Sequence, residues 1–176
     1  KNLLDKTTSF LFKRLSEAAG LALLVLSVLL LISLISYSPE DPNFIFPENA
    51  EINNFLGAKG SYSSDILYQS IGLISLLVPI SFILISISVI VNKKILQIIE
   101  SFFFVILYSI VGTLFFTAFH TETFWLTVNG NNGFIGNLFE ETFLINLITL
   151  NNQISYVVLV FLIILFFLLS INFKVK

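Results

Sequence analysis

The stretch GLALLVLSVLLLISLIS, residues 20–36, decides the fold class of this chain. It contains no charged side chain and is rich in leucine. With Ala18 and Ala19 it approaches the roughly 20 apolar residues that an α-helix needs to cross about 30 Å of hydrocarbon. The sequence therefore predicts a membrane-spanning helix over residues 18–36.

Three more apolar stretches follow, over residues 66–91, 101–119 and 154–173. Charged residues make up only 11% of the chain and hydrophobic residues 56%, against about 25% charged residues in a typical soluble domain. The second stretch contains Pro79, which we expect to bend its helix. The prediction is an all-α membrane protein, a single four-helix transmembrane bundle over residues 1–176.

The distribution of lysine and arginine predicts the orientation of this bundle. Eight of the nine basic residues fall on one side of a four-span arrangement. The residues that set this topology are Lys13 and Arg14 before the first span, Lys93 and Lys94 between the second and third, and Lys174 and Lys176 after the fourth. Because basic residues are retained on the cytoplasmic side, we expect both termini in the cytoplasm. The short link over residues 92–96 predicts an antiparallel hairpin.

The two loops on the opposite side, residues 37–65 and 120–153, are longer. In the second loop, Asn129-Gly-Asn-Asn-Gly133 indicates a turn. Apolar residues then recur at helical spacing over residues 134–148, a length too short to span a membrane. We therefore predict a short interfacial amphipathic helix in the second periplasmic loop.

The sequence offers few groups for chemistry. It has no cysteine and one histidine, and we interpret His120, near Trp125, as part of the polar and aromatic membrane interface. We expect no catalytic, cofactor-binding or metal-binding residue in this segment. Ser75, Ser81, Ser86 and Ser88 are the only hint of a polar track, which an alternative function as a small four-helix transporter or channel subunit would need. Gly72 or Pro79 could break the second span.

The loop segments resemble a known family. The run Tyr37-Ser-Pro-Glu-Asp-Pro42 resembles the YSPxDP signature of the FtsK/SpoIIIE family of bacterial DNA translocases, and a second family stretch reads N-x-x-G-x-x-G-A-x-x-A-D. The residues that carry the resemblance are Tyr37, Pro39, Asp41, Pro42, Asn53, Gly57, Gly60, Asp65, Gly72, Gly133 and Gly136. Ser61, Ser64 and Asn132 depart from the family pattern, because they replace two alanines and a glycine.

The resemblance implies a membrane anchor in the bacterial inner membrane, at the division septum. Such a domain would interact with other division proteins, form homo-oligomers and contact membrane lipid, in a protein that couples cell division to chromosome segregation. The family's ATPase motor, with ATP, Mg and DNA as its ligands, is expected after Lys176. Apolar loop residues are candidate partner contacts: Phe44, Ile45, Phe46, Phe55, Phe124 and Trp125.

Overall fold

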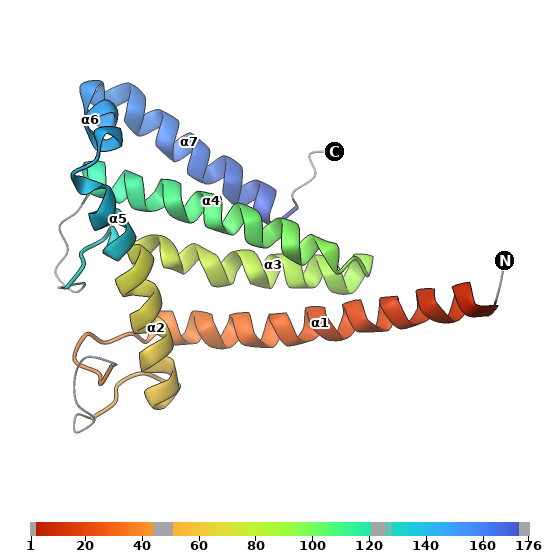
Figure 1. The fold of residues 1–176 in the computed structure, drawn as a ribbon. Helices are drawn as coiled ribbons and strands as arrows, with labels where there is room; N and C mark the ends of the chain where they lie inside the picture. Colours follow the sequence, from red (N-terminus) through yellow and green to blue (C-terminus); the bar gives the residue numbers. More distant parts are fainter. Residues whose placement is uncertain (1–2, 44–50, 121–125, 127, 173–176) are drawn as a thin grey trace.

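The computed structural model describes residues 3–43, 51–120, 126 and 128–172. Its elements are α1 (Leu3–Ile35), α2 (Gly57–Ile71), the 3₁₀ helix η1 (Gly72–Leu76), α3 (Leu77–Asn92), α4 (Leu96–Phe119), α5 (Gly133–Glu140), α6 (Phe143–Leu150) and α7 (Asn152–Ser170) (Figure 1). Four of the described segments are long and apolar enough to cross a membrane: residues 7–35, 57–92, 96–119 and 152–170. The predicted fold class is confirmed.

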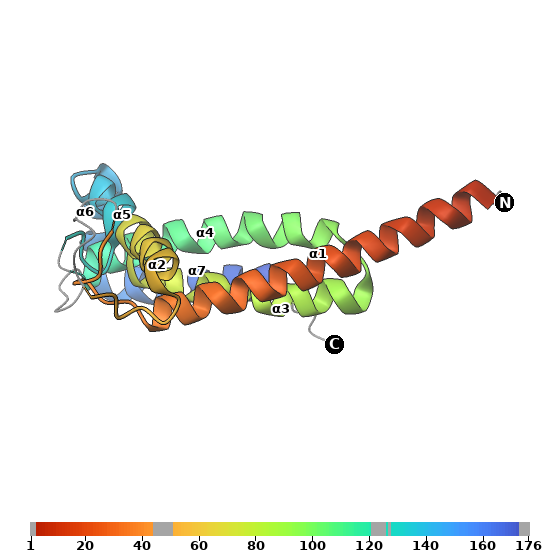
Figure 2. The same cartoon turned by 90° about the horizontal axis from the view of Figure 1, so that it is seen from below.

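The spanning helices lie in the order α1, α3, α4, α7, with α1 and α7 at the two sides of the row (Figure 1). α1 packs mainly against α3, and α7 mainly against α4. The short helices α2, α5 and α6 gather at one end of the row, called the loop end below. The opposite end carries the link between α3 and α4 and is called the turn end. α1 begins and α7 ends toward the turn end (Figures 1 and 2).

The first helix is longer than the predicted span. It begins at Leu3 instead of residue 18, and at 1.5 Å per residue its total length is about 50 Å. Residues 3–17 contain charged side chains, so hydropathy did not include them, yet they lack glycine and proline and continue the helix without a break. The start of α1 consequently extends past the other helices (Figure 2).

The second span differs from its prediction more strongly. Residues 66–71 belong to α2, which lies across the loop end, and the chain turns into α3 only after Gly72 (Figure 1). Gly72 has a φ of 67°, a conformation that glycine adopts without strain. Pro79 does not bend the helix, because it occupies the first turn of α3, where a missing N–H removes no intrahelical hydrogen bond.

The predicted hairpin between the second and third spans is present. α3 ends at Asn92, Lys93 adopts a left-handed conformation with a φ of 57°, and α4 begins at Leu96. The Lys93 N–H donates to the Val89 carbonyl at 2.7 Å, which satisfies one of the free carbonyls at the end of α3.

The single helix predicted over residues 134–148 is divided in the structure. α5 ends at Glu140 and α6 begins at Phe143, because the Thr142 hydroxyl and N–H both bond to the Phe139 carbonyl. The turn predicted before it is present over residues 128–132. The interfacial location of these helices stays a prediction. α7 ends at Ser170, and Lys174 and Lys176 lie outside the described residues.

The helices make close contact through small residues. A Cβ at Gly20 would lie 2.8 Å from the Ile90 side chain and 3.2 Å from the Ser86 carbonyl, so glycine allows α1 to approach α3. Ser81 is fully buried and bonds to the Tyr108 hydroxyl of α4 at 3.1 Å and to Ser170 of α7 at 3.0 Å. This polar junction fixes three helices against one another.

Candidate functional site

Most of the residues that carry the family resemblance meet at the loop end. They lie in residues 36–43, 51–72 and 128–140, which are called the cap below. Each of these segments is close to the end of a spanning helix, where backbone carbonyls have no partner within the helix. Such groups are costly to bury in a membrane unless another group binds them.

The cap begins with a tight turn after α1. The Asp41 N–H donates to the Ser38 carbonyl at 3.2 Å, and Pro39 occupies the turn position that suits its fixed φ. Asp41 is almost fully buried, and its carboxylate accepts from the Asn53 N–H, the Asn53 amide and the Asn54 N–H at 2.8–3.1 Å. One aspartate thereby holds the two ends of the first loop together.

Asn54, which is not among the residues predicted from the sequence, binds the end of α1. Its amide nitrogen donates to the Ser33 carbonyl at 2.9 Å and to the Ser36 carbonyl at 3.3 Å. Gly60 leaves room for it, since a Cβ there would lie 2.0 Å from the Asn54 Oδ1. The spacing N-x-x-G-x-x-G is met by Asn54, Gly57 and Gly60, not by Asn53. The spacing of Asn54 from these two glycines is therefore the sequence feature that predicts its role.

The serines that depart from the family pattern form hydrogen bonds in the cap. Ser61 donates to the Pro42 carbonyl at 2.7 Å, and Ser64 donates to the Gly60 carbonyl at 2.9 Å. Both side chains are buried. Ser33 of α1 also donates to the Gly60 carbonyl, at 2.6 Å. The backbone of α2 is thus bound directly to the end of α1.

Asp65 connects the first loop to α2. The Tyr37 hydroxyl donates to its Oδ1 at 3.4 Å, and the Gln69 amide donates to the same atom at 3.3 Å. Burial, and then the charge of Asp65, raises the pKa of Tyr37 to about 12. Tyr37 therefore remains a protonated donor at neutral pH. Its ring contacts that of Tyr68, whose hydroxyl donates to the Leu34 carbonyl at 3.1 Å.

Gly72 and Gly133 bring the two loops into backbone contact. A Cβ at Gly72 would lie 1.9 Å from the Asn131 carbonyl oxygen, and a Cβ at Gly133 would lie 2.4 Å from the Gly72 nitrogen. The same Asn131 carbonyl accepts from the Leu73 N–H at 2.9 Å. Both glycines have a φ of 67°. No other residue type fits this contact without displacement of the backbone.

The second loop is bound to α4 through Asn132, the other departure from the family pattern. Its amide nitrogen donates to Asn137 Oδ1 at 2.7 Å and to the Thr117 hydroxyl at 3.3 Å. Gly136 permits this, because a Cβ there would lie 2.5 Å from the Asn132 Cβ. Asn129 donates to Gln69 at 2.8 Å, which completes a chain of polar contacts from Tyr37 to α4.

His120 lies at the boundary of the cap. It is exposed, and its ring contacts Phe115 and Tyr156, while its carbonyl accepts from the Asn131 amide at 2.9 Å. Trp125 lies outside the described residues, as do Phe44, Ile45, Phe46 and Phe124. Among the described residues no group of three or more His, Cys, Asp or Glu side chains is placed to hold a metal ion.

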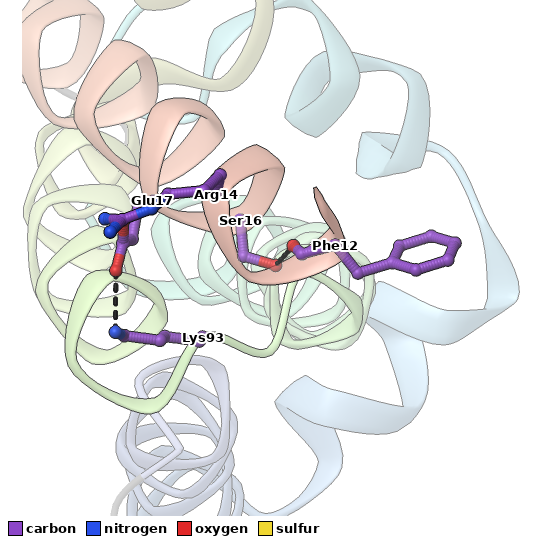
Figure 3. Close-up of polar contacts among 5 residues, drawn as sticks. All are labelled: Phe12, Arg14, Ser16, Glu17 and Lys93. Atoms are coloured by element: carbon purple, nitrogen blue, oxygen red, sulfur yellow. Dashed lines mark hydrogen bonds and ion pairs between the residues drawn. The ribbon is translucent and has the colours of Figure 1, made fainter. Parts of the chain in front are cut away.

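Of the residues predicted to set the topology, the structure describes Lys13, Arg14, Lys93 and Lys94, and these four lie at the turn end. Glu17 accepts from Lys93 at 2.7 Å and from Arg14 at 2.6 Å, so it binds α1 to the α3–α4 link (Figure 3). Lys13 and Lys94, which adjoin Arg14 and Lys93 in the chain, are exposed. The structure therefore brings Arg14 and Lys93 together, as expected if they mark one membrane surface.

The serines considered for a polar track bind neighbouring groups instead. Ser86 bonds to the Phe82 carbonyl, and Ser88 bonds to Asn92 and Gln97. Ser81 belongs to the junction with Tyr108 and Ser170 described above. The Ser75 hydroxyl is buried without a hydrogen-bond partner. These separate contacts provide no specific support for a transporter or channel.

Comparisons with known proteins agree with the sequence resemblance. A family model described as the 4TM region of DNA translocase FtsK/SpoIIIE matches residues 12–176. A DNA translocase FtsK of Azospirillum brasilense is 38% identical over 68 residues, which cover 38% of this chain and 11% of that protein. A DNA translocase FtsK of Rickettsia bellii is 35% identical over 66 residues, or 38% of this chain and 9% of that protein.

The aligned part spans about a tenth of the length of these curated relatives. No solved structure matches the chain.

Proposed function

Because this chain belongs to the family of FtsK/SpoIIIE four-span membrane regions, we propose that it anchors an FtsK-type DNA translocase in the bacterial inner membrane at the division septum. The family match over residues 12–176 is the observation that carries the proposal. The chain would bind other division proteins and help couple division to chromosome segregation. ATP hydrolysis and DNA binding would belong to the motor expected after Lys176.

The cap supports this proposal because its contacts fix the two loops in one conformation. Two loops that are far apart in the sequence share backbone contacts and a chain of hydrogen bonds, and both are bound to the ends of spanning helices. A surface fixed in this way loses little conformational entropy when a partner binds. Phe55 is 79% exposed on the cap and is the described candidate for a partner contact.

The open row of helices supports self-association of the domain. α1 and α7, at its two sides, present broad apolar faces, for example at Leu26 and Phe161. Copies of the domain would meet through these faces, and lipid would cover the remainder. Native mass spectrometry of the full-length protein tests this point. Oligomers are expected, and a monomer at all concentrations and in all detergents would contradict self-association.

Replacement of the domain in cells tests the septal role. We expect that a strain whose motor carries an unrelated four-span anchor forms filaments, since the motor is retained at the membrane but the division contacts are lost. A fluorescent fusion of the native domain should collect at midcell, and the unrelated anchor should not. Normal division and cell length in the exchanged strain would contradict the proposal.

Phe55→Ala is a finer variant for the same assay. The side chain is exposed, so its truncation should leave the fold intact while it weakens recruitment to midcell. Phe103→Ala, at an exposed position on α4 outside the apolar faces of α1 and α7, is the matched control. Equal recruitment of both variants would exclude Phe55 as a contact.

A further inference from the structure

A groove of about 430 Å³ opens at the turn end, between α1, the α3–α4 link with the start of α4, and Asn172 after α7. Polar side chains from four segments line it: Ser16, Lys93, Lys94, Gln97, Glu100 and Asn172. Phe12 and Leu96 contribute apolar walls. α1 packs on α3, and its start extends past the other helices (Figure 2). The groove lies beside α1 at Phe12 and Ser16.

The charge around the groove is positive. Two segments that border it, α1 and the α3–α4 link, contribute four basic residues: Lys13, Arg14, Lys93 and Lys94. The nearby carboxylates are those of Glu17 and Glu100. Glu17 is bound by both Arg14 and Lys93 (Figure 3), and Glu100, which lines the groove, accepts from the Asn172 amide at 3.4 Å. Among the described residues, the Lys94 ammonium has no partner.

The first turn of α4 adds to this positive potential. Ile95 and Leu96 line the groove and stand at the start of a helix of 24 residues. The first N–H groups of a helix have no acceptor within it, and the helix dipole places partial positive charge there. The Gln97 and Ile98 N–H groups donate to the Lys94 and Ile95 carbonyls. The N–H groups of Ile95 and Leu96, with the side chains of Lys94 and Gln97, are the donors suited to a phosphate oxygen.

The groove also lies at the depth of lipid headgroups. Ser16, which lines the groove, is about 27 Å along α1 from Leu34 at 1.5 Å per residue. That distance is close to the hydrocarbon thickness of about 30 Å. When the end of α1 reaches one membrane surface, the groove reaches the other, with its apolar walls next to the acyl chains.

We propose that this groove binds the phosphate headgroup of an anionic phospholipid, with the Lys94 and Gln97 side chains and the N–H groups of Ile95 and Leu96 as its donors. The proposal rests on the membrane anchoring of the domain and not on its role at the septum, so failure of one leaves the other open to its own test. Glu17 supports the site indirectly, because its ion pair with Lys93 holds α1 beside the groove.

Lipid retention tests the proposal directly. The full-length protein is reconstituted in equal amounts of phosphatidylglycerol and phosphatidylcholine with the same acyl chains, extracted in mild detergent, and its retained lipids are quantified by mass spectrometry. We expect preferential retention of phosphatidylglycerol and a loss of about fivefold in Lys94→Gln, given the usual contribution of one lysine near an anionic membrane.

Lys59→Gln is the matched control, because Lys59 is the basic residue of the loop end and its replacement should leave retention unchanged. Thermal unfolding should show that both variants fold. Equal retention of the two lipids, or an unchanged preference in Lys94→Gln, would overturn the proposal. A wash with 10 mM inorganic phosphate separates the two phosphate sources: a lipid site retains its phosphatidylglycerol, and complete displacement would identify a phosphate site without a role for the lipid.

Discussion

At the scale of single residues, the cap solves the problem of helix ends at a membrane surface. The last carbonyls of α1 accept from the side chains of Asn54 and Tyr68, and Asp41 receives three N–H donors. These polar groups are buried, and each hydrogen bond removes a desolvation cost that an isolated helix end would carry. The polar residues are therefore part of the fold.

Asn54→Ala should destabilise the protein strongly. The substitution leaves the Ser33 and Ser36 carbonyls without their side-chain donor, and we expect a loss of about 2 kcal/mol or more in the free energy of unfolding. Asn53→Ala is the control, since it removes one side-chain hydrogen bond while the Asn53 backbone N–H still binds Asp41. Reversible unfolding of detergent-solubilised protein measures both. A smaller effect for Asn54 than for Asn53 would refute its assigned role.

Gly72→Ala and Gly57→Ala separate backbone contact from backbone strain. Both glycines have positive φ, but a Cβ at Gly57 meets nothing within 4 Å while one at Gly72 strikes the Asn131 carbonyl. We expect about 1 kcal/mol of destabilisation for Gly57→Ala and about 4 kcal/mol or more for Gly72→Ala. Thermal denaturation of the two variants gives the comparison. Equal effects would mean that the two loops do not meet at Gly72.

The raised pKa of Tyr37 predicts a loss of stability at alkaline pH. A tyrosine with a folded pKa of about 12 and an unfolded pKa near 10 stabilises the fold fully below pH ~10 and loses this contribution as the pH rises toward 12. Tyr37→Phe should flatten that part of the pH profile of the unfolding midpoint. Tyr156→Phe, at an exposed position, is the control. An unchanged alkaline slope in Tyr37→Phe would argue against the buried contact with Asp65.

At the scale of elements, hydropathy predicts that four spanning helices exist, but it does not predict where each helix begins, breaks or bends. Long apolar stretches predict four spans because hydrocarbon leaves few alternatives to a helix. The break at Gly72 depends on the Asn131 carbonyl, a partner about 60 residues away that periodicity does not reveal. Pro79 predicted a bend because a proline inside a helix removes a hydrogen bond. At the start of α3, however, its ring fits the helix. Asn54 was not predicted because the asparagine of the family stretch was assigned to Asn53, one residue too early.

The contact between α1 and α3 depends on a small residue. Gly20→Val should push α1 away from Ser86 and Ile90 and cost about 2 kcal/mol of stability, as overpacking does elsewhere. Ala22→Val adds side-chain volume on the exposed side of α1 and should have a small effect. Unfolding midpoints measure the difference. If Ala22→Val is as harmful as Gly20→Val, the effect belongs to the helix and not to its contact.

At the scale of the whole molecule, the chain has two ends of different kinds. The loop end is closed by hydrogen bonds and glycine contacts between distant segments. The turn end is basic, is joined by the Glu17–Lys93 ion pair and contains the groove beside α4. This division agrees with the asymmetry of lysine and arginine in the sequence. It also separates a proposed partner surface from the surface to which a motor would be attached.

The orientation of these two ends is the central claim, and cysteine accessibility tests it most directly. The chain has no cysteine of its own, so Ser63→Cys at the loop end and Lys94→Cys at the turn end can each be introduced singly, at exposed positions, with any cysteine elsewhere in the full-length protein replaced. A membrane-impermeant maleimide is applied to intact spheroplasts. We predict that it labels Ser63→Cys at once and Lys94→Cys only after permeabilisation. Labelling of Lys94→Cys in intact spheroplasts, with Ser63→Cys protected, would contradict the account.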